Sequence, residues 1–436
     1  MTVSKKPLKD ARSAALMILQ GVIVEGESLN TLLTPMLETL PAQEKSFAQM
    51  LVYGVLRHRW QLEAIISLLL SKPLKTKDSD IQLIVMLALF QLLDTRVPEY
   101  AAVDAAVKLV KKTGKSWARA LVNGVLRNFT RQKDELLNKI ETDQQAVYSH
   151  PQWMIEKIKT DWPDHWQQIL RANNQQAPMV LRVNARYLSA AEYAAKLDTG
   201  AQPHASAEQA LVLEQACDVH QLPGYNEGWF SVQDAGAQLA AVLLDAQPGD
   251  RVLDCCAAPG GKTGHILERQ PDLLMLAMDI SASRLKRVED NLQRLGLSAN
   301  LHIGSAEAPD DWWDKQMFDR ILLDVPCSAS GVIRRHPDIK SLRREADMVS
   351  LVETQRKILN SIWPLLKPGG RLLYATCSIF KQENEQQMEA FLAMTQDASE
   401  ILINATWGQA RSHGRQIFPG EQDMDGFYYA ILQKKA

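Results

Sequence analysis

The chain has 436 residues, of which 46% are hydrophobic and 23% are charged. This composition is typical of soluble globular proteins and excludes collagen-like, disordered and disulfide-stapled chains. The length predicts two or three domains. Charged residues interrupt the apolar pattern near the N-terminus and no cleavage site follows it, so we expect a cytoplasmic protein. The longest apolar stretch, residues 81–93, is too short to span a bilayer and predicts a buried helix, with no membrane partner.

The net charge of −2 conceals a basic N-terminal part. Residues 1–150 hold 20 Lys and Arg against 15 Asp and Glu, an excess of +5, which leaves 29 against 36 for the remaining residues. Much of the excess lies between Lys108 and Lys139. A surface of this kind suits a phosphate backbone. The alternative is that these are solvated lysines on ordinary helices.

Apolar residues keep a helical spacing from residue 8 to about residue 139, without strand-like alternation. Prolines at 35, 41, 73 and 98 predict breaks that divide this region into five or six helices. We therefore expect an all-α first domain over residues 1–142.

A different pattern follows. Between residues 143 and 230, a Trp-rich helix precedes short apolar runs at 179–183 and 210–213, which predicts a small α+β connector. From residue 231 to 436, strands alternate with helical stretches, and this alternation predicts a parallel α/β sheet. The expected strands are residues 251–253, 273–278, 300–303, 320–323 and 371–375.

The segment RVLDCCAAPGGKTGHIL predicts a strand, a loop with two glycines and then a helix, an arrangement that brings backbone close to a nucleotide-like ligand. Neither a Walker P-loop nor GxGxxG is present. The next strand ends in Asp279, where a carboxylate can accept both hydroxyls of a ribose. Asp254 and Asp324 add carboxylates at the same edge, which favours an adenosine-type ligand carrying a sulfonium. The alternative is a glycine turn with solvated aspartates.

The five cysteines form no CxxC pair, so we expect free thiols and no metal site (Cys217, Cys255, Cys256, Cys327 and Cys377). Cys327 and Cys377 each follow a predicted strand, in DVPCS and ATCS, and should lie on the ligand-binding rim. An isolated cysteine is most often a buried small hydrophobe. Two at neighbouring strand ends beside a cofactor loop instead indicate a reactive thiolate.

Several ordered motifs over residues 150–436 resemble the RNA cytosine-C5 methyltransferase family: QDAGAQ, DCCAAPGGKT, DVPCS, GVIRRHPDIK, ATCS and DGFYYA. The helical first domain is similar to the RNA-binding NusB fold. The resemblance implies a Rossmann-like catalytic domain, S-adenosylmethionine as cofactor, and methyl transfer to carbon 5 of a cytosine. It also implies a monomer whose partner is 16S ribosomal RNA or a partly assembled small ribosomal subunit.

The resemblance also implies roles for single residues. Cys377 would be the nucleophile that adds to cytosine carbon 6, Cys327 would act in elimination, and Asp324 would hold the base. DNA cytosine-C5 methyltransferases use a PC-type cysteine as nucleophile, so the opposite assignment is the rival. The implied cofactor contacts are Cys256, Ala257, Ala258, Pro259, Gly260, Gly261, Lys262, Asp279, Ser305 and Asp324. Ser305 departs from the acidic residue frequent in the family, and whether Lys262 takes part in the chemistry or only fixes the loop stays open.

The loop at residues 331–344 is rich in Arg and Lys and would place cations beside an entering RNA strand. Ordinary salt bridges are the alternative. Two other function classes compete with the methyltransferase. A non-catalytic RNA-binding or assembly factor would not need both cysteines and Asp324. A cysteine hydrolase would need a histidine base, and His265, His302 and His336 show no triad order.

Overall fold

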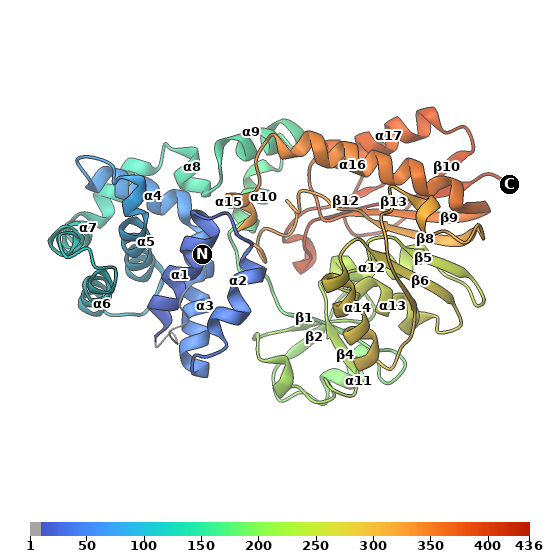
Figure 1. Ribbon diagram of the computed structural model, residues 1–436, viewed down its shortest axis with the longest axis horizontal. Coiled ribbons are helices and arrows are strands. Elements are labelled where there is room, and N and C mark those ends of the chain that lie inside the picture. The colour runs from blue at the N-terminus through green and yellow to red at the C-terminus, as the bar shows by residue number, and fades with distance from the viewer. Residues whose placement is uncertain (1–9) are drawn as a thin grey trace. The chain divides into compact units, whose positions relative to one another are not determined.

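The computed structural model describes residues 10–436, which form two compact units (Figure 1). The first unit comprises the described residues up to Gln175 together with Ile333–Glu345, and the second comprises Gln176–Val332 and Ala346–Ala436. The Trp-rich helix that we grouped with the connector therefore belongs to the first unit. Residues 8 and 9 of the predicted helical region lie outside the described residues, and the domain boundaries at 142 and 230 stay predictions.

The first unit is helical, as predicted. Its helices are α1 (Ala11–Ile23), α2 (Leu29–Leu37), α3 (Ala42–Arg57), α4 (Arg59–Leu69), α5 (Ser79–Asp94), α6 (Glu99–Lys112), α7 (Ala118–Ile140), α8 (Gln144–Tyr148), α9 (Gln152–Asp161), α10 (Trp166–Asn173) and α15 (Ile339–Leu342). Helix α5 is the expected buried helix, because its side chains from Leu83 to Phe90 are all buried. Within residues 10–436, no helix is both long and apolar enough to cross a membrane.

The helix count in this region was wrong, because seven α-helices lie between Ala11 and Ile140. Pro35 does not break a helix but lies near the end of α2, where the lost N–H costs one hydrogen bond in a helix that stops two residues later. Conversely, α3 and α4 are separated only by His58, whose backbone leaves the helical region at φ −108° and ψ 17°. A histidine carries no break signal in the sequence.

The second unit begins with the α+β connector. Its strands β1 (Val180–Val183), β2 (Ala201–Pro203), β3 (Ala210–Leu213) and β4 (Phe230–Val232) form an antiparallel sheet in the order β2-β3-β1-β4, with helix α11 (Ala190–Ala194) beside it. Both apolar runs that predicted strands are therefore strands.

The catalytic sheet follows. Its parallel strands are β5 (Arg251–Asp254), β6 (Leu274–Asp279), β7 (Asn300–Ile303), β8 (Phe318–Asp324) and β9 (Leu366–Thr376), and each contains one of the predicted strands in whole or nearly so. The sheet is mixed rather than parallel throughout, because β13 (Phe427–Lys434) runs antiparallel to β9. The short strands β10 (Ala398–Ile401), β11 (Gln409–Ala410) and β12 (Arg415–Ile417) complete it.

Helices cover both faces of this sheet (Figure 1). Helices α12 (Ala235–Leu244), α13 (Gly261–Arg269) and α14 (Ala282–Arg294) pack on one face, against side chains such as Leu322 and Leu373. Helices α16 (Asp347–Ile362) and α17 (Glu385–Met394) pack on the other, against the alternate side chains Leu323 and Tyr374. The period of two along each strand thus builds two apolar cores, as expected for a strand buried on both faces.

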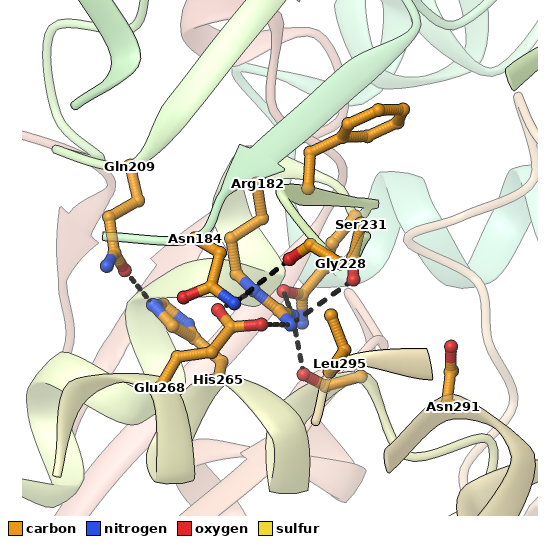
Figure 2. A network of polar contacts seen from close by, with 12 residues as sticks. Arg182, Asn184, Gln209, Gly228, Ser231, His265, Glu268, Asn291 and Leu295 are labelled. Carbon is orange, nitrogen blue, oxygen red and sulfur yellow. Dashed lines mark hydrogen bonds and ion pairs between the residues drawn. The ribbon is translucent and has the colours of Figure 1, made fainter. Parts of the chain in front are cut away.

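One buried ion pair joins the connector to helix α13 (Figure 2). Arg182 on β1 donates from Nε and Nη2 to the two carboxylate oxygens of Glu268, over 2.8 and 2.7 Å, and both side chains are fully buried. The same guanidinium donates to the carbonyl oxygen of Gly261 over 2.6 Å. Within the connector, the side-chain amide of Asn184 donates to the carbonyl of Gly228 over 3.0 Å. The helix that begins at the predicted cofactor loop is therefore fixed from the connector.

We expect the Glu268→Gln variant to lose about 3 to 5 kcal/mol of unfolding free energy, because it leaves the Arg182 guanidinium buried without a counter-ion. Urea unfolding followed by tryptophan fluorescence measures this loss. The control is Glu289→Gln, which removes one partner of the exposed Lys286 ion pair and should leave the free energy within experimental error. Equal losses in the two variants would contradict the importance given to the buried pair.

Candidate active site

The predicted cofactor loop lies at the carboxyl edge of the sheet, between Asp254 at the end of β5 and Gly261 at the start of α13. Gly260 caps the helix with φ +95°, a conformation that side chains other than glycine rarely adopt. A Cβ atom at this position would also meet the backbone Cα of Val288 at 3.1 Å. The loop is therefore held close to α14 and leaves its backbone facing the sheet edge.

Asp254 is buried beside this loop, and only one of its two carboxylate oxygens has a hydrogen-bond partner. Thr263 donates its hydroxyl to Oδ2 over 2.7 Å, but Oδ1 has no hydrogen-bond partner. Burial, partly offset by the Thr263 hydrogen bond, raises the pKa of Asp254 to about 7. An unpaired buried acceptor is costly, so it marks a place where a donor or cation belongs.

Asp279 and Ser305 occupy the next two positions along the edge. Asp279 ends β6, is buried, and accepts the N–H groups of Ser281 over 3.0 Å and of Ala258 over 3.4 Å. Arg284 lies 3.4 Å from Oδ2, the oxygen that accepts the N–H of Ala258. Ser305 follows β7, and its hydroxyl accepts the N–H of Glu307 over 3.2 Å. The contact of Ser305 with adenine stays a prediction.

These residues fit S-adenosylmethionine. The positive-φ glycine allows close approach of backbone, Asp279 is placed to accept ribose hydroxyls, and the orphan oxygen of Asp254 suits a cationic or donor group. No diphosphate cradle is needed for a ligand whose charges are an amino acid and a sulfonium. Among residues 10–436, no group of three or more His, Cys, Asp or Glu side chains is arranged to hold a metal ion.

Lys262 and Asp324 form an ion pair between the cofactor loop and the end of β8. The Lys262 ammonium lies 2.6 Å from Oδ2 of Asp324. Burial disfavours the charge of Lys262, but the carboxylate of Asp324 outweighs this effect and, with a contribution from Cys377, holds the pKa of Lys262 above its ordinary value. Lys262 is thus a cation next to both Asp324 and Cys377, and its part in the chemistry stays a prediction.

Cys327 and Cys377 meet at the ends of β8 and β9. Their sulfur atoms are 3.4 Å apart, Cys327 is buried and Cys377 is half-buried. The hydrogen bond to Cys377, together with burial, raises the pKa of Cys327 well above its ordinary value. Ionisation of Cys327 is therefore opposed, and its thiol can donate a hydrogen bond to a thiolate on Cys377.

The other cysteines have no comparable position. All five are free thiols. Burial raises the pKa of Cys255 and of Cys256, so both stay protonated, as expected for loop and packing residues. The histidines that a hydrolase would need are also apart from one another. His265 contacts Gln209, the ring of His302 lies 6.4 Å from that of Trp312 at a tilt of 43°, and His336 belongs to the other unit.

Two glycines bring the motif loops together at the thiols. The N–H of Gly331 donates to the carbonyl of Cys377 over 2.9 Å, and the N–H of Gly426 donates to the carbonyl of Gly331 over 2.8 Å. A Cβ atom on Gly331 would lie 2.1 Å from the Gly426 carbonyl oxygen. The preceding Asp425 is held by Asp234, which accepts its N–H over 3.0 Å. The QDAGAQ and DGFYYA motifs therefore build the frame of the site.

The prediction that the cations of residues 331–344 face an RNA strand is partly wrong. Arg334 and Lys340 are buried in the first unit, 3% and 1% exposed. Lys340 donates to the carbonyls of Arg57 and Ser149, each over 2.7 Å, and burial lowers its pKa well below the ordinary value. The sequence pattern could not separate these anchoring cations from exposed ones.

In the basic segment from Lys108 to Lys139, some cations form ion pairs with carboxylates and others are exposed to solvent. Lys115 pairs with Asp78 and Asp80 over 3.0 and 2.7 Å, and Lys112 pairs with Asp10 over 2.6 Å. Other cations are exposed, namely Lys111, Arg119, Arg127 and Arg131. Trp117, beside them in the sequence, is 53% exposed. Exposed cations with an aromatic side chain suit an RNA backbone and its bases.

A residue that the sequence analysis missed is Glu383, which is fully buried below the two cysteines. Ser328 and Ser378, the residues after Cys327 and Cys377, both donate to its Oε2 atom. The repeated Cys-Ser pair at two strand ends was visible in the sequence. Its common partner was not, because the bond joins segments 55 residues apart.

The mixed sheet and the glycine loop at its carboxyl edge are those of a Rossmann-like methyltransferase. Family models agree: residues 241–433 match the 16S rRNA methyltransferase RsmB/F model, residues 9–131 match the NusB family, and residues 150–220 match the RsmF/B-like ferredoxin-like domain.

Curated relatives match over almost the whole chain. The ribosomal RNA small subunit methyltransferase B of Vibrio cholerae is 48% identical, covering 98% of this chain and 98% of its own, and that of Escherichia coli O7:K1 is 45% identical, covering 99% and 100%. The chain belongs to the 16S rRNA methyltransferase RsmB/F family, and it is an S-adenosylmethionine-dependent rRNA methyltransferase.

Solved structures show the same fold. The crystal structure of PH0851 has a TM-score of 0.80 at 22% identity and covers 98% of this chain and 100% of its own. A methyltransferase homolog protein from Pyrococcus horikoshii has a TM-score of 0.59 at 26% identity, covering 67% of this chain and 98% of its own.

We expect the contribution of Asp254 to the stability of the protein to fall as the pH rises from about 4 to about 7. The pKa of Asp254 is about 7 when folded, against an ordinary value of 3.8, so unfolding releases a proton in this window and is favoured by rising pH. The Asp254→Asn variant lacks this titrating group, so its unfolding free energy should rise by roughly 1.4 kcal/mol per pH unit relative to that of the unsubstituted protein within this window.

Urea unfolding of the two proteins between about pH 5 and pH 8 measures this difference. The exposed Asp311→Asn variant is the control and should show no such trend. A gap between Asp254→Asn and the unsubstituted protein that does not widen with pH would contradict the raised pKa.

Proposed function

We propose that this enzyme methylates carbon 5 of a cytosine through a covalent bond between Cys377 and carbon 6 of the base. The observation that supports this assignment is the asymmetric thiol pair, in which Cys327 is the buried partner whose ionisation is opposed. Its substrate is ribosomal RNA. We further propose 16S rRNA or a partly assembled small subunit as the partner, and a cytoplasmic monomer as the acting form.

Cys377 begins the reaction because carbon 5 of cytosine is a poor nucleophile. Addition of the Cys377 thiolate to carbon 6 moves an electron pair into the ring and makes carbon 5 nucleophilic. The Lys262 ammonium lies close enough to interact electrostatically with the Cys377 sulfur. The base reaches this position only if it leaves its stack, which favours single-stranded or loosened RNA.

Asp324 stabilises the ring during the addition. We assign it to share a proton with cytosine N3, where negative charge develops as the sulfur adds. The Lys262 ammonium, 2.6 Å from Asp324, can supply that proton and neutralise the carboxylate. When bound, S-adenosylmethionine would supply an electrophilic methyl group for carbon 5, and the electron pair of its broken S–CH3 bond would stay on the donor sulfur as a neutral thioether.

Cys327 completes the reaction. Once Cys377 is bonded to carbon, its sulfur is uncharged, and the repulsion that opposed a thiolate on Cys327 is gone. The Cys327 thiol can then lose its proton to water, and the resulting thiolate can accept the proton of carbon 5. The electron pair of that C–H bond restores the ring double bond and expels the Cys377 thiolate, which frees the product. The separation of 3.4 Å between the two sulfur atoms supports this proposal, because both can then reach one base.

We expect the Cys377→Ser variant to lose methyl transfer by at least about a thousandfold, because a neutral hydroxyl is a far weaker nucleophile than a thiolate. Incubation with undermethylated ribosomal RNA and methyl-labelled S-adenosylmethionine, followed by analysis for 5-methylcytosine, measures the rate. The buried Cys255→Ser variant is the control. Intact transfer by Cys377→Ser would refute the assignment.

For the Cys327→Ser variant, we expect a covalent protein–RNA complex to accumulate, since addition and methylation proceed while elimination fails. A shifted band on a denaturing gel, removed by ribonuclease, detects it. The double variant Cys327→Ser/Cys377→Ser should give no such band. Absence of the band from the single variant would show that Cys327 has no role in elimination.

A further inference from the structure

Each reactive cysteine is followed by a serine, and both serines bind one carboxylate. The hydroxyl of Ser328 donates to Oε2 of Glu383 over 2.5 Å, and the hydroxyl of Ser378 donates to the same atom. Ser328, Ser378 and Glu383 are at most 1% exposed. The carboxylate therefore lies where the loops after β8 and β9 converge, next to Cys327 on one side and Cys377 on the other.

The second carboxylate oxygen is bound as fully. Oε1 accepts the N–H of Ser328 over 2.8 Å and the side-chain amide of Gln355 over 3.0 Å. The Gln355 amide also donates to the carbonyl of Pro326, the residue before Cys327, over 2.9 Å. Each carboxylate oxygen therefore accepts two hydrogen bonds, and the four donors together hold the side chain in one place.

This negative charge is compensated by hydrogen bonds alone. Within residues 10–436, no lysine or arginine forms an ion pair with Glu383. The neighbouring Glu385, by contrast, pairs with Arg411 over 2.9 Å. A buried charge without a counter-ion acts on nearby titratable groups over a longer range than a neutralised pair does.

The serines also lock the two loops to each other. Ser330 accepts the N–H of Ile379 over 3.0 Å, and its hydroxyl lies 3.1 Å from that of Ser378. The backbone bond from Gly331 to Cys377 closes the same junction. Movement of either cysteine would therefore break several bonds that end on Glu383 or its serines.

We propose that Glu383 is a positioning residue that fixes the two sulfur atoms against each other and selects which of them ionises. It holds Cys327 and Cys377 in contact through Ser328 and Ser378, and its charge disfavours a thiolate on Cys327. The inference rests on the proposed function, in which Cys377 is the nucleophile. It deepens that function by naming what keeps the pair asymmetric.

The electrostatics of Cys327 agree with this geometry. The hydrogen bond to Cys377 and burial raise the pKa of Cys327 most, and the charges of Cys377 and Glu383 add to the increase. A thiolate of high pKa is also a stronger base. The same charge that keeps Cys327 protonated at the start thus makes it a better acceptor for the carbon 5 proton at the end.

The test measures the reactivity of each thiol without RNA or methyl donor. Brief labelling with iodoacetamide over a range of pH, followed by digestion and mass spectrometry, gives initial alkylation rates for Cys327 and Cys377. In the Glu383→Gln variant the amide keeps the shape of the side chain, and the serine hydroxyls can turn to accept from it. We expect the ratio of Cys327 to Cys377 labelling to rise about tenfold, with the Cys327 profile moved about one unit to lower pH.

Two controls separate this effect from unfolding. Glu385→Gln changes a buried carboxylate of the same segment that does not contact the serines, and it should leave the ratio unchanged. Cys255, which is buried, should stay unlabelled in every variant. An unchanged ratio in Glu383→Gln, with Cys255 still protected, would overturn the proposal. Since no methyl transfer is involved, this result is independent of the Cys377→Ser assay.

A second variant tests the positioning role separately. Ser378→Ala keeps the charge and removes one arm of the junction, and we expect its kcat for methyl transfer to fall about tenfold with KM for S-adenosylmethionine unchanged. The exposed Ser350→Ala variant is its control. An unaltered kcat in Ser378→Ala would refute the positioning role. If Cys255 becomes reactive in Glu383→Gln, that variant is unfolded, and the Ser378→Ala result alone then tests the proposal.

Discussion

Two sulfur atoms 3.4 Å apart in a partly buried site cannot both carry a negative charge. At an effective dielectric constant of about 20, the repulsion between two such charges is about 5 kcal/mol, so the pair holds one thiolate at a time. Chemistry that needs a nucleophile first and a base afterwards can use this constraint directly. In the mechanism that we propose, Cys377 uses this single charge to add to the base, and Cys327 can carry it only after Cys377 is bonded to carbon.

The fold holds this pair in place from several directions. The parallel strands β8 and β9 bring Asp324 and the two cysteines to one edge, and helix α13 after the cofactor loop brings Lys262 to the same edge. The antiparallel strand β13 places Gly426 against Gly331, where a side chain would not fit. The buried pair of Arg182 and Glu268 fixes the far side of the cofactor helix (Figure 2). Each of these contacts joins segments that are distant in the sequence.

Features that depend on nearby residues could be predicted from the sequence, whereas features that depend on contacts between distant segments could not. The strands that carry Asp254, Asp279 and Cys377 were predictable, because a short apolar run followed by a polar residue is a local signal. Helix α5 was predictable because a long apolar stretch is also a local signal. The antiparallel strand β13 and the role of Glu383 were not, because strand direction and a shared hydrogen-bond partner depend on tertiary contacts. The burial of Lys340 was missed because an anchoring lysine and a solvated one look alike in a sequence.

The central claim is that the sulfur of Cys377, and not that of Cys327, bonds to the base. RNA containing 5-fluorocytidine tests it most directly, because carbon 5 then carries fluorine in place of the proton that elimination must remove, and the adduct persists. After reaction with S-adenosylmethionine, nuclease and protease digestion followed by mass spectrometry locates the modified cysteine. We predict a methylated fluorocytidine adduct on the peptide that contains Cys377. An adduct on the peptide that contains Cys327 would contradict the account.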